Sequence, residues 1–231
     1  MQTTENPGRE RILARIRSAL RTQASTRHSE PVGDIFPPIP DALDRFRREC
    51  EANKTECIVT KDLAQTEEKL NELVASLPNG EIFVQDAPLL RHMAASWSQR
   101  RIRWSGEGVP SEATRAAITL VESLVAATGS VLVSASCGGR GASIMAPVHV
   151  VVASIHQLVP TLDTAFAWMN ARGTAKQNSM VTLVTGPSRT GDIEKIIVLG
   201  AHGPQRLVVL LAQDDLLVSA DGLSAGPTPD C

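Results

Sequence analysis

The first hydrophobic pattern along the chain is that of an amphipathic helix over residues 8–23. Ile12, Ile16 and Leu20 recur at four-residue spacing, which places them on one face of an α-helix. The other side is rich in arginine, which is typical of a solvated face on a helix that packs on the body or on a second subunit. A nucleic-acid or membrane-surface helix is the alternative. A proline-rich segment follows, which is typical of an extended linker, so the pattern predicts an N-terminal helical arm, residues 1–30.

The rest of the chain, residues 31–231, alternates short apolar segments with longer amphipathic ones. Helix-length connections between short strands are typical of parallel β-α-β units, whose crossovers are right-handed. Strands crowd together beyond residue 130 with few helices between them, so antiparallel additions are expected. The predicted fold class is α/β, with a mixed, mainly parallel sheet flanked by helices. Strands are expected at 57–59, 81–84, 101–104 (an edge strand), 130–135, 148–153, 180–185, 196–199 and 206–212, and helices from Asp41 and at 62–76, 88–97, 111–127 and 160–171.

The composition is that of an ordinary globular protein, with 42% hydrophobic and 21% charged residues. A net charge of -2 argues against a role in binding polyanions such as nucleic acids. No apolar run reaches the roughly 18 residues of a membrane span. The polar, arginine-rich N-terminus carries no secretory signal, so a cytoplasmic location is expected. Residues 213–231 are rich in glycine and proline and are expected to form a flexible tail.

The four cysteines, Cys50, Cys57, Cys137 and Cys231, are scattered, and none belongs to a C-x-x-C pair. Zinc or iron–sulfur ligation within this chain is therefore not expected. No H-x-H or H-E-x-x-H run indicates another metal site. Cys137 lies in a glycine-containing loop, but a catalytic thiol needs a partner that lowers its pKa, and the sequence fixes none.

The strongest candidate for chemistry is the turn that follows the predicted buried strand ending at Thr185. Ser188 and Thr190 can cap a short helix whose free amide groups would face an anion. Arg189 adds a forked cationic donor suited to a carboxylate or phosphate. The alternative is a capped tight turn in which the arginine pairs with an acidic neighbour, such as Asp192.

Two segments upstream carry further candidates. Thr128, Gly129 and Ser130 precede a predicted strand, where they either face a ligand or form a helix C-cap. Arg140 lies in a loop with three glycines, whose backbone can approach a ligand that the arginine would hold. A flexible hairpin loop is the alternative for this second segment.

A third candidate is His202, which with Gly203 lies on a sharp turn between two predicted strands. Its imidazole can donate, accept or titrate near neutral pH, and a hydrogen-bonded structural histidine is the alternative. His149 lies among valines in a predicted strand, where packing in the core or an interface is expected.

The segment from Gly186 to Leu211 resembles the C-terminal signature of the LUD family, in its lactate utilization protein C branch. A second match covers Ala126–Val133, then Arg140 and the later segment Pro147–His149. The resemblance implies a sugar-isomerase or CoA-transferase-like α/β fold. It also implies a part in oxidising L-lactate to pyruvate, with iron–sulfur clusters held by partner proteins rather than by this chain.

The chain departs from the family pattern at Ala127, because relatives usually carry an acid before their Thr-Gly-Thr run. An alanine cannot act as a base, nucleophile or orienting group there. Glu122 lies five residues earlier and would need a shift in register to replace that acid. The catalytic residue is therefore left unassigned.

These observations lead to one hypothesis: the candidate residues border a single pocket for a small carboxylate such as lactate, or for a phosphate. The alternatives are an isomerase or transferase acting on a phosphosugar or acyl-CoA, and a non-catalytic subunit. The arm also predicts a homo-oligomer. The candidate ligand-binding residues are Thr128, Gly129, Ser130, Arg140, Ser188, Arg189, Thr190, Asp192, His202 and Gly203.

Overall fold

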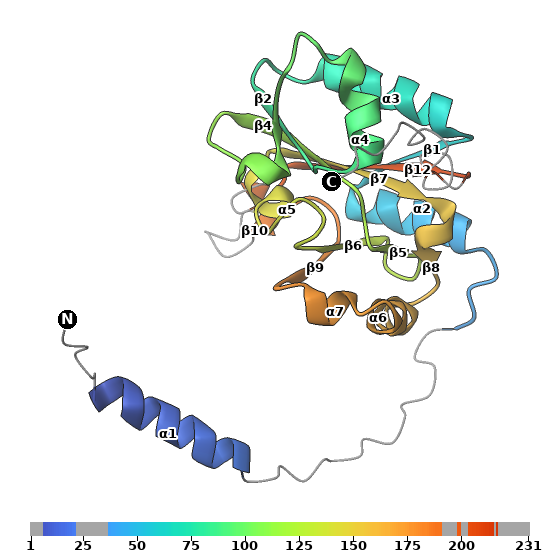
Figure 1. Cartoon of the computed structure of the whole chain (residues 1–231). Helices are drawn as coiled ribbons and strands as arrows, with labels where there is room; N and C mark the ends of the chain where they lie inside the picture. The colour runs from blue at the N-terminus through green and yellow to red at the C-terminus, as the bar shows by residue number, and fades with distance from the viewer. Residues whose placement is uncertain (1–6, 22–36, 191–197, 200–202, 215, 217–231) are drawn as a thin grey trace, which may run out of the picture. The chain divides into compact units, whose positions relative to one another are not determined.

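The computed structural model describes residues 7–21, 37–190, 198–199, 203–214 and 216. The chain divides between Pro37 and Pro38 into two units. The first unit contains α1 (Pro7–Arg21), which confirms the helix predicted for the arm (Figure 1). Ile12 and Ile16 on this helix are exposed. Most of the predicted C-terminal tail, like Asp192 and His202, lies outside the described residues.

The second unit is built around a six-stranded sheet in which every neighbouring pair of strands is parallel. The strand order is β1-β12-β7-β4-β2-β3, with β3 at an edge as predicted. The central strands are apolar at nearly every position because both of their faces are covered. The six strands are β1 (Glu56–Thr60), β2 (Glu81–Val84), β3 (Arg101–Trp104), β4 (Thr114–Thr119), β7 (Val148–Ser154) and β12 (Arg206–Ala212).

One face of the sheet is covered by α3 (Leu63–Ser76) and α4 (Pro88–Met93). Leu70 and Leu90 of these helices are fully buried in the core that they share with the sheet. The Asp62 side chain caps α3 by accepting a hydrogen bond of 2.8 Å from the Gln65 backbone N–H. The helix predicted over residues 88–97 ends earlier as an α-helix and continues as the 3₁₀ turn η1 (Ala94–Ser96).

The opposite face packs against α2 (Ala42–Asn53) and a second, four-stranded sheet of order β8-β5-β6-β9. Phe46 and Cys50 of α2 are fully buried in this second core. Within the second sheet β6 runs antiparallel to both of its neighbours, as the strand-rich C-terminal half predicted. Its strands are β5 (Ser123–Val125), β6 (Ser130–Ser134), β8 (Leu158–Val159) and β9 (Val181–Val184).

A further helix, α6 (Leu162–Ala171), covers the far face of the second sheet and buries Ala165 and Met169 there. Figure 1 shows the resulting layers of the body: α3 and α4, the large sheet, α2 with the small sheet, and α6. The described chain also contains α5 (Ala142–Met145), α7 (Thr174–Gln177), β10 (Arg189–Thr190), β11 (Val198–Leu199), η2 (Ser105–Glu107) and η3 (Ile155–Gln157).

The helical prediction for residues 111–127 is wrong, because this segment forms β4 and β5. Alanine, leucine and glutamate give it the composition of a helix. However, β4 lies between β7 and β2 and is buried on both faces, so its side chains show no alternation of apolar and polar positions. Tertiary burial therefore overrides local helix propensity in this segment.

No helix in the part of the chain that the structure describes is long and apolar enough to cross a membrane. Those same residues contain no group of three or more His, Cys, Asp or Glu side chains placed to hold a metal ion.

Candidate functional site

Several residues predicted to bind an anion gather around the C-terminal end of α2. The Asn53 side chain donates a hydrogen bond of 2.8 Å to the Thr128 carbonyl. The Ser130 hydroxyl lies 2.7 Å from the hydroxyls of both Thr128 and Thr185. Gly129 has a φ of +61°, and a Cβ there would lie 2.7 Å from the Cys50 nitrogen. This group is therefore packed tightly against the helix.

The turn that carries Arg189 reaches the same place. The Arg189 guanidinium donates to the backbone carbonyl of Asn53, and an arginine in this position stabilises the partial negative charge of a helix C-terminus. The Ser188 backbone N–H donates to the Pro204 carbonyl at 2.8 Å, and a Cβ on Gly203 would lie 3.0 Å from that of Ser188. The structure thus brings together six of the predicted residues: Thr128, Gly129, Ser130, Ser188, Arg189 and Gly203. Thr190 continues into β10, and its side chain is outside the described set.

Arg140 does not join this group. Its guanidinium Nε donates a hydrogen bond of 3.1 Å to the hydroxyl of Ser179, which precedes β9, whereas Thr185 follows that strand. Six residues of extended chain separate these two positions, a span of roughly 20 Å. The two arginines thus make their hydrogen bonds at opposite ends of the β6–β9 pair.

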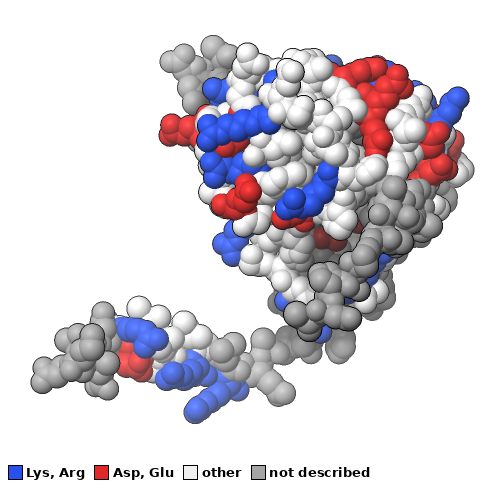
Figure 2. All heavy atoms as spheres, turned by 45° about the horizontal axis from the view of Figure 1, so that its top comes forward, with Lys and Arg blue, Asp and Glu red and all other residues white. Residues whose placement is uncertain are grey.

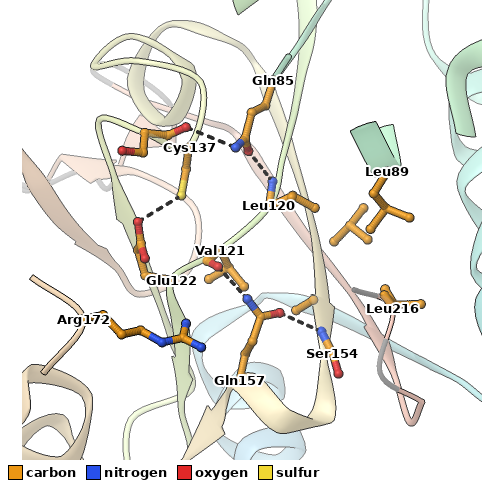
Figure 3. A pocket seen from close by; sticks show the side chains of 13 residues that line it. Gln85, Leu89, Leu120, Val121, Glu122, Cys137, Ser154, Gln157, Arg172 and Leu216 are labelled. Atoms are coloured by element: carbon orange, nitrogen blue, oxygen red, sulfur yellow. Dashed lines mark hydrogen bonds between the residues drawn. The ribbon is translucent and has the colours of Figure 1, made fainter. Parts of the chain in front are cut away.

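A pocket of about 190 Å³ lies elsewhere, at the carboxyl ends of β2, β4 and β7. Figure 3 shows its two sides: Leu89 and Leu216 form an apolar wall, and Glu122 and Arg172 lie across from them. Ser136 and Cys137 line it too, so part of the glycine-containing loop contributes to the pocket although Arg140 does not. The volume suits a small metabolite rather than a drug-sized ligand.

The strand order explains why a pocket forms here. From β2 the chain proceeds outward to β3, then crosses back over β2 to β4 and continues through β7 to β12 in the other direction. The connections therefore diverge between β2 and β4, which leaves an opening beyond their carboxyl ends. Ligands of open parallel sheets bind at such topological switch points.

Two glutamine side chains hydrogen-bond the backbone segment that follows β4 and lines the pocket. The Gln85 side chain accepts from the Leu120 backbone N–H at 2.8 Å and donates to the Ser136 carbonyl at 3.1 Å. The Gln157 side chain donates to the Val121 carbonyl at 2.7 Å and accepts from the Ser154 backbone N–H at 2.9 Å. Both amides thus fix the two residues that immediately precede Glu122 (Figure 3).

The half-buried Glu122 carboxylate is held on one side by the protein. Its Oε1 accepts a hydrogen bond from the Ser134 hydroxyl and lies 3.7 Å from the Cys137 thiol. Burial, followed by the charge of Glu122, raises the pKa of Cys137 to about 11. The thiol therefore remains protonated at neutral pH, and the structure offers no activation of Cys137 as a nucleophile.

Arg172 caps the C-terminus of α6 and provides the positive charge of the pocket. Its guanidinium lies 4.5 Å from the centre of the Trp168 ring, which supports the exposed side chain by a cation–π contact. The ion pairs among the described residues do not include one between Arg172 and Glu122. The two opposite charges are thus both available to a ligand.

Sequence reasoning missed this pocket, including Glu122 as a member of it. Its polar residues come from separate segments that meet only once the strand order is known. The one local signal was a polar residue placed directly after an apolar strand, as for Gln85 after Val84. His149, by contrast, is fully buried beside Thr119, and burial lowers its pKa to about 4, in agreement with the expected core position.

Comparison with known proteins agrees with the sequence resemblance. The LUD domain pattern matches residues 43–212. Lactate utilization protein C from Geobacillus sp. is 24% identical over 240 residues, which cover 93% of this chain and 99% of that protein. Lactate utilization protein C from Macrococcus caseolyticus is 25% identical over 186 residues, which cover 75% of this chain and 79% of that protein.

A solved structure shares the fold. The crystal structure of a DUF162 family protein from Deinococcus radiodurans is similar with a TM-score of 0.58 and 16% identity, over 74% of this chain and 96% of that one. The α/β architecture predicted from the sequence is thereby confirmed. Since the matched LUD segment spans well over half of the chain, this protein belongs to the LUD domain family.

Proposed function

We propose that this protein acts in lactate utilization by binding a small 2-hydroxy or 2-oxo carboxylate, such as lactate or pyruvate, in the pocket beside Arg172. Relatives named lactate utilization protein C, of which one matches nearly the whole chain, support the role in lactate utilization. The location of the binding site is supported by two opposite charges. Arg172 and Glu122 line the same pocket but form no ion pair with each other. A guanidinium provides two parallel donors for a carboxylate.

The alternative location of the ligand site is the group of predicted residues around Arg189. There the guanidinium already donates to the Asn53 carbonyl, and the glycines leave no room beside α2. Among the described residues no acidic side chain forms an ion pair with the Arg172 guanidinium, so its charge is free to hold a ligand. This difference favours the pocket at the carboxyl end of the sheet.

Calorimetry tests the location of the binding site directly. Lactate and pyruvate are titrated into the natural chain and into the variants Arg172→Gln and Arg189→Gln. We expect Arg172→Gln to weaken binding at least about tenfold, since a charge-assisted hydrogen bond is lost, and Arg189→Gln to bind like the natural chain. Loss of binding in Arg189→Gln alone would transfer the site to the end of α2. Binding of glucose 6-phosphate or coenzyme A, with neither carboxylate bound, would favour an isomerase or transferase.

Oxidation of lactate to pyruvate releases two electrons and two protons. We infer that the two electrons pass to iron–sulfur partner proteins of the same system, as the family resemblance implies, and that the two protons are released to water. Affinity purification of the tagged chain from its native cells, followed by iron analysis of the bound proteins, checks this part. Recovery of the chain without any iron-containing partner contradicts it.

A further inference from the structure

We propose that Glu122 makes the pocket select a 2-hydroxy acid over the corresponding 2-oxo acid, by accepting a hydrogen bond from the ligand's hydroxyl group. The inference rests on the proposed function, because it concerns the ligand of the same pocket. It assigns Glu122 a role in specificity, and it concerns binding rather than the chemical step.

The two oxygens of Glu122 are in different situations. Oε1 accepts from the Ser134 hydroxyl and lies next to the Cys137 thiol, so protein donors occupy it. No hydrogen bond from a residue that the structure describes reaches Oε2. The residue is half-buried and lines the pocket. One acceptor of the carboxylate is thus left for a donor that comes with the ligand.

The position of this acceptor is fixed by the surrounding polypeptide. Gln85 and Gln157 hydrogen-bond the backbone of Leu120 and Val121, and Ser134 holds the carboxylate itself. The neighbouring Ser123 is the first residue of β5, so the chain is held on both sides of Glu122. An acceptor that cannot turn away imposes its polarity on the ligand.

The two acids differ at the atom that would face Glu122. The hydroxyl of lactate donates a hydrogen bond, whereas the ketone oxygen of pyruvate only accepts, so it would confront a carboxylate oxygen of the same polarity. The carboxylate that both acids share would pair with Arg172 and cannot distinguish them. A site built to pair with a hydroxyl group rejects the analogue that lacks it, because a polar group of the protein is then left without a partner.

A ligand series on the natural chain tests the inference without any substitution. We expect calorimetry at pH 7.5 to give lactate an affinity at least about tenfold above those of propionate, which lacks the hydroxyl, and pyruvate. Pyruvate or propionate bound as tightly as lactate overturns the inference but leaves the proposed function intact. Absence of binding for all three overturns both.

Glu122→Gln provides the second arm, because the amide keeps the shape of the side chain and can turn an N–H donor towards the ligand. The ratio of lactate to pyruvate affinity should then fall about tenfold or more. Glu112→Gln is the matched control, since Glu112 is exposed and does not line the pocket, and its ratio should equal that of the natural chain. An unchanged ratio in a folded Glu122→Gln protein that still binds both acids overturns the assignment.

Discussion

Glu81 shows how burial and hydrogen bonding compete at a single side chain. Its carboxylate is only 2% exposed at the start of β2. Burial alone would raise its pKa, but the ion pair with Arg103 and hydrogen bonds from Ser111 and Thr114 outweigh that effect. The pKa of Glu81 is consequently held below its ordinary value of 4.5. The charge therefore stabilises the folded state whenever the group is ionised.

Glu81→Gln should reduce the free energy of unfolding by about 2 kcal/mol at pH 7, because it leaves the surrounding donors without their anion. A carboxyl group with a lowered folded-state pKa stabilises above its unfolded pKa and loses that effect as the pH falls. The difference between the two proteins should thus be complete above about pH 5 and shrink below about pH 4.5. Urea unfolding at several pH values measures it. The exposed Glu112→Gln should cost under about 0.5 kcal/mol, and an equal loss in both variants would contradict the prediction.

At the scale of elements, a residue predicted to bind a ligand can instead allow two elements of secondary structure to pack closely. Gly129 lies between α2 and β6, with a positive φ and no room for a side chain. Gly139 also has a positive φ, of +84°, yet nothing lies within 4 Å of the place of its Cβ. A comparison of these two glycines therefore separates the free-energy cost of an unfavourable backbone conformation from that of a steric clash.

Gly129→Ala should lower the free energy of unfolding by about 3 kcal/mol, since it combines an unfavourable φ with a collision against the α2 backbone. Gly139→Ala should lower it by about 1 kcal/mol, because only the backbone term applies. Chemical denaturation of both variants under identical conditions provides the measurement. Equal losses would mean that α2 moves aside without cost.

Local sequence patterns predicted most elements, and the exceptions have a common cause. Capping residues such as Asp62 and the apolar runs of β7 and β12 are local signals, and their elements were found where expected. The segment that forms β4 carries no such signal, because its burial depends on neighbours distant in sequence. Helix propensity then pointed to the wrong structure.

For the whole molecule, the order of strands decides where a ligand can bind. The divergence of connections between β2 and β4 creates the opening beside Glu122, and no local pattern contains that information. Arg140 and Arg189 illustrate the converse. Both are typical anion-binding residues in glycine-containing turns, but the antiparallel pairing of β6 with β9 sends their contacts to opposite ends of the second sheet. Residue chemistry could therefore be predicted, whereas its assembly into a site could not.

Charge is distributed unequally between the two parts of the chain. Residues 1–30 contain six arginines and three glutamates, a net charge of +3, whereas residues 31–231 contain 17 Lys and Arg against 22 Asp and Glu, a net charge of -5. Figure 2 shows the basic side chains along α1. Ile12 and Ile16 of that helix are 60% and 49% exposed, so an apolar stripe accompanies the positive charge.

These features predict self-association in which the arm of one copy binds the acidic body of another. Deletion of residues 1–30 should lower the number of copies per particle derived from light scattering, because both the apolar and the charged contacts are lost. The double variant Ile12→Ser, Ile16→Ser should also lower this number although it keeps every charge. Raising the salt concentration to 1 M should weaken the association of the natural chain through screening. An equal number of copies per particle with and without the arm would show that this helix does not hold the copies together.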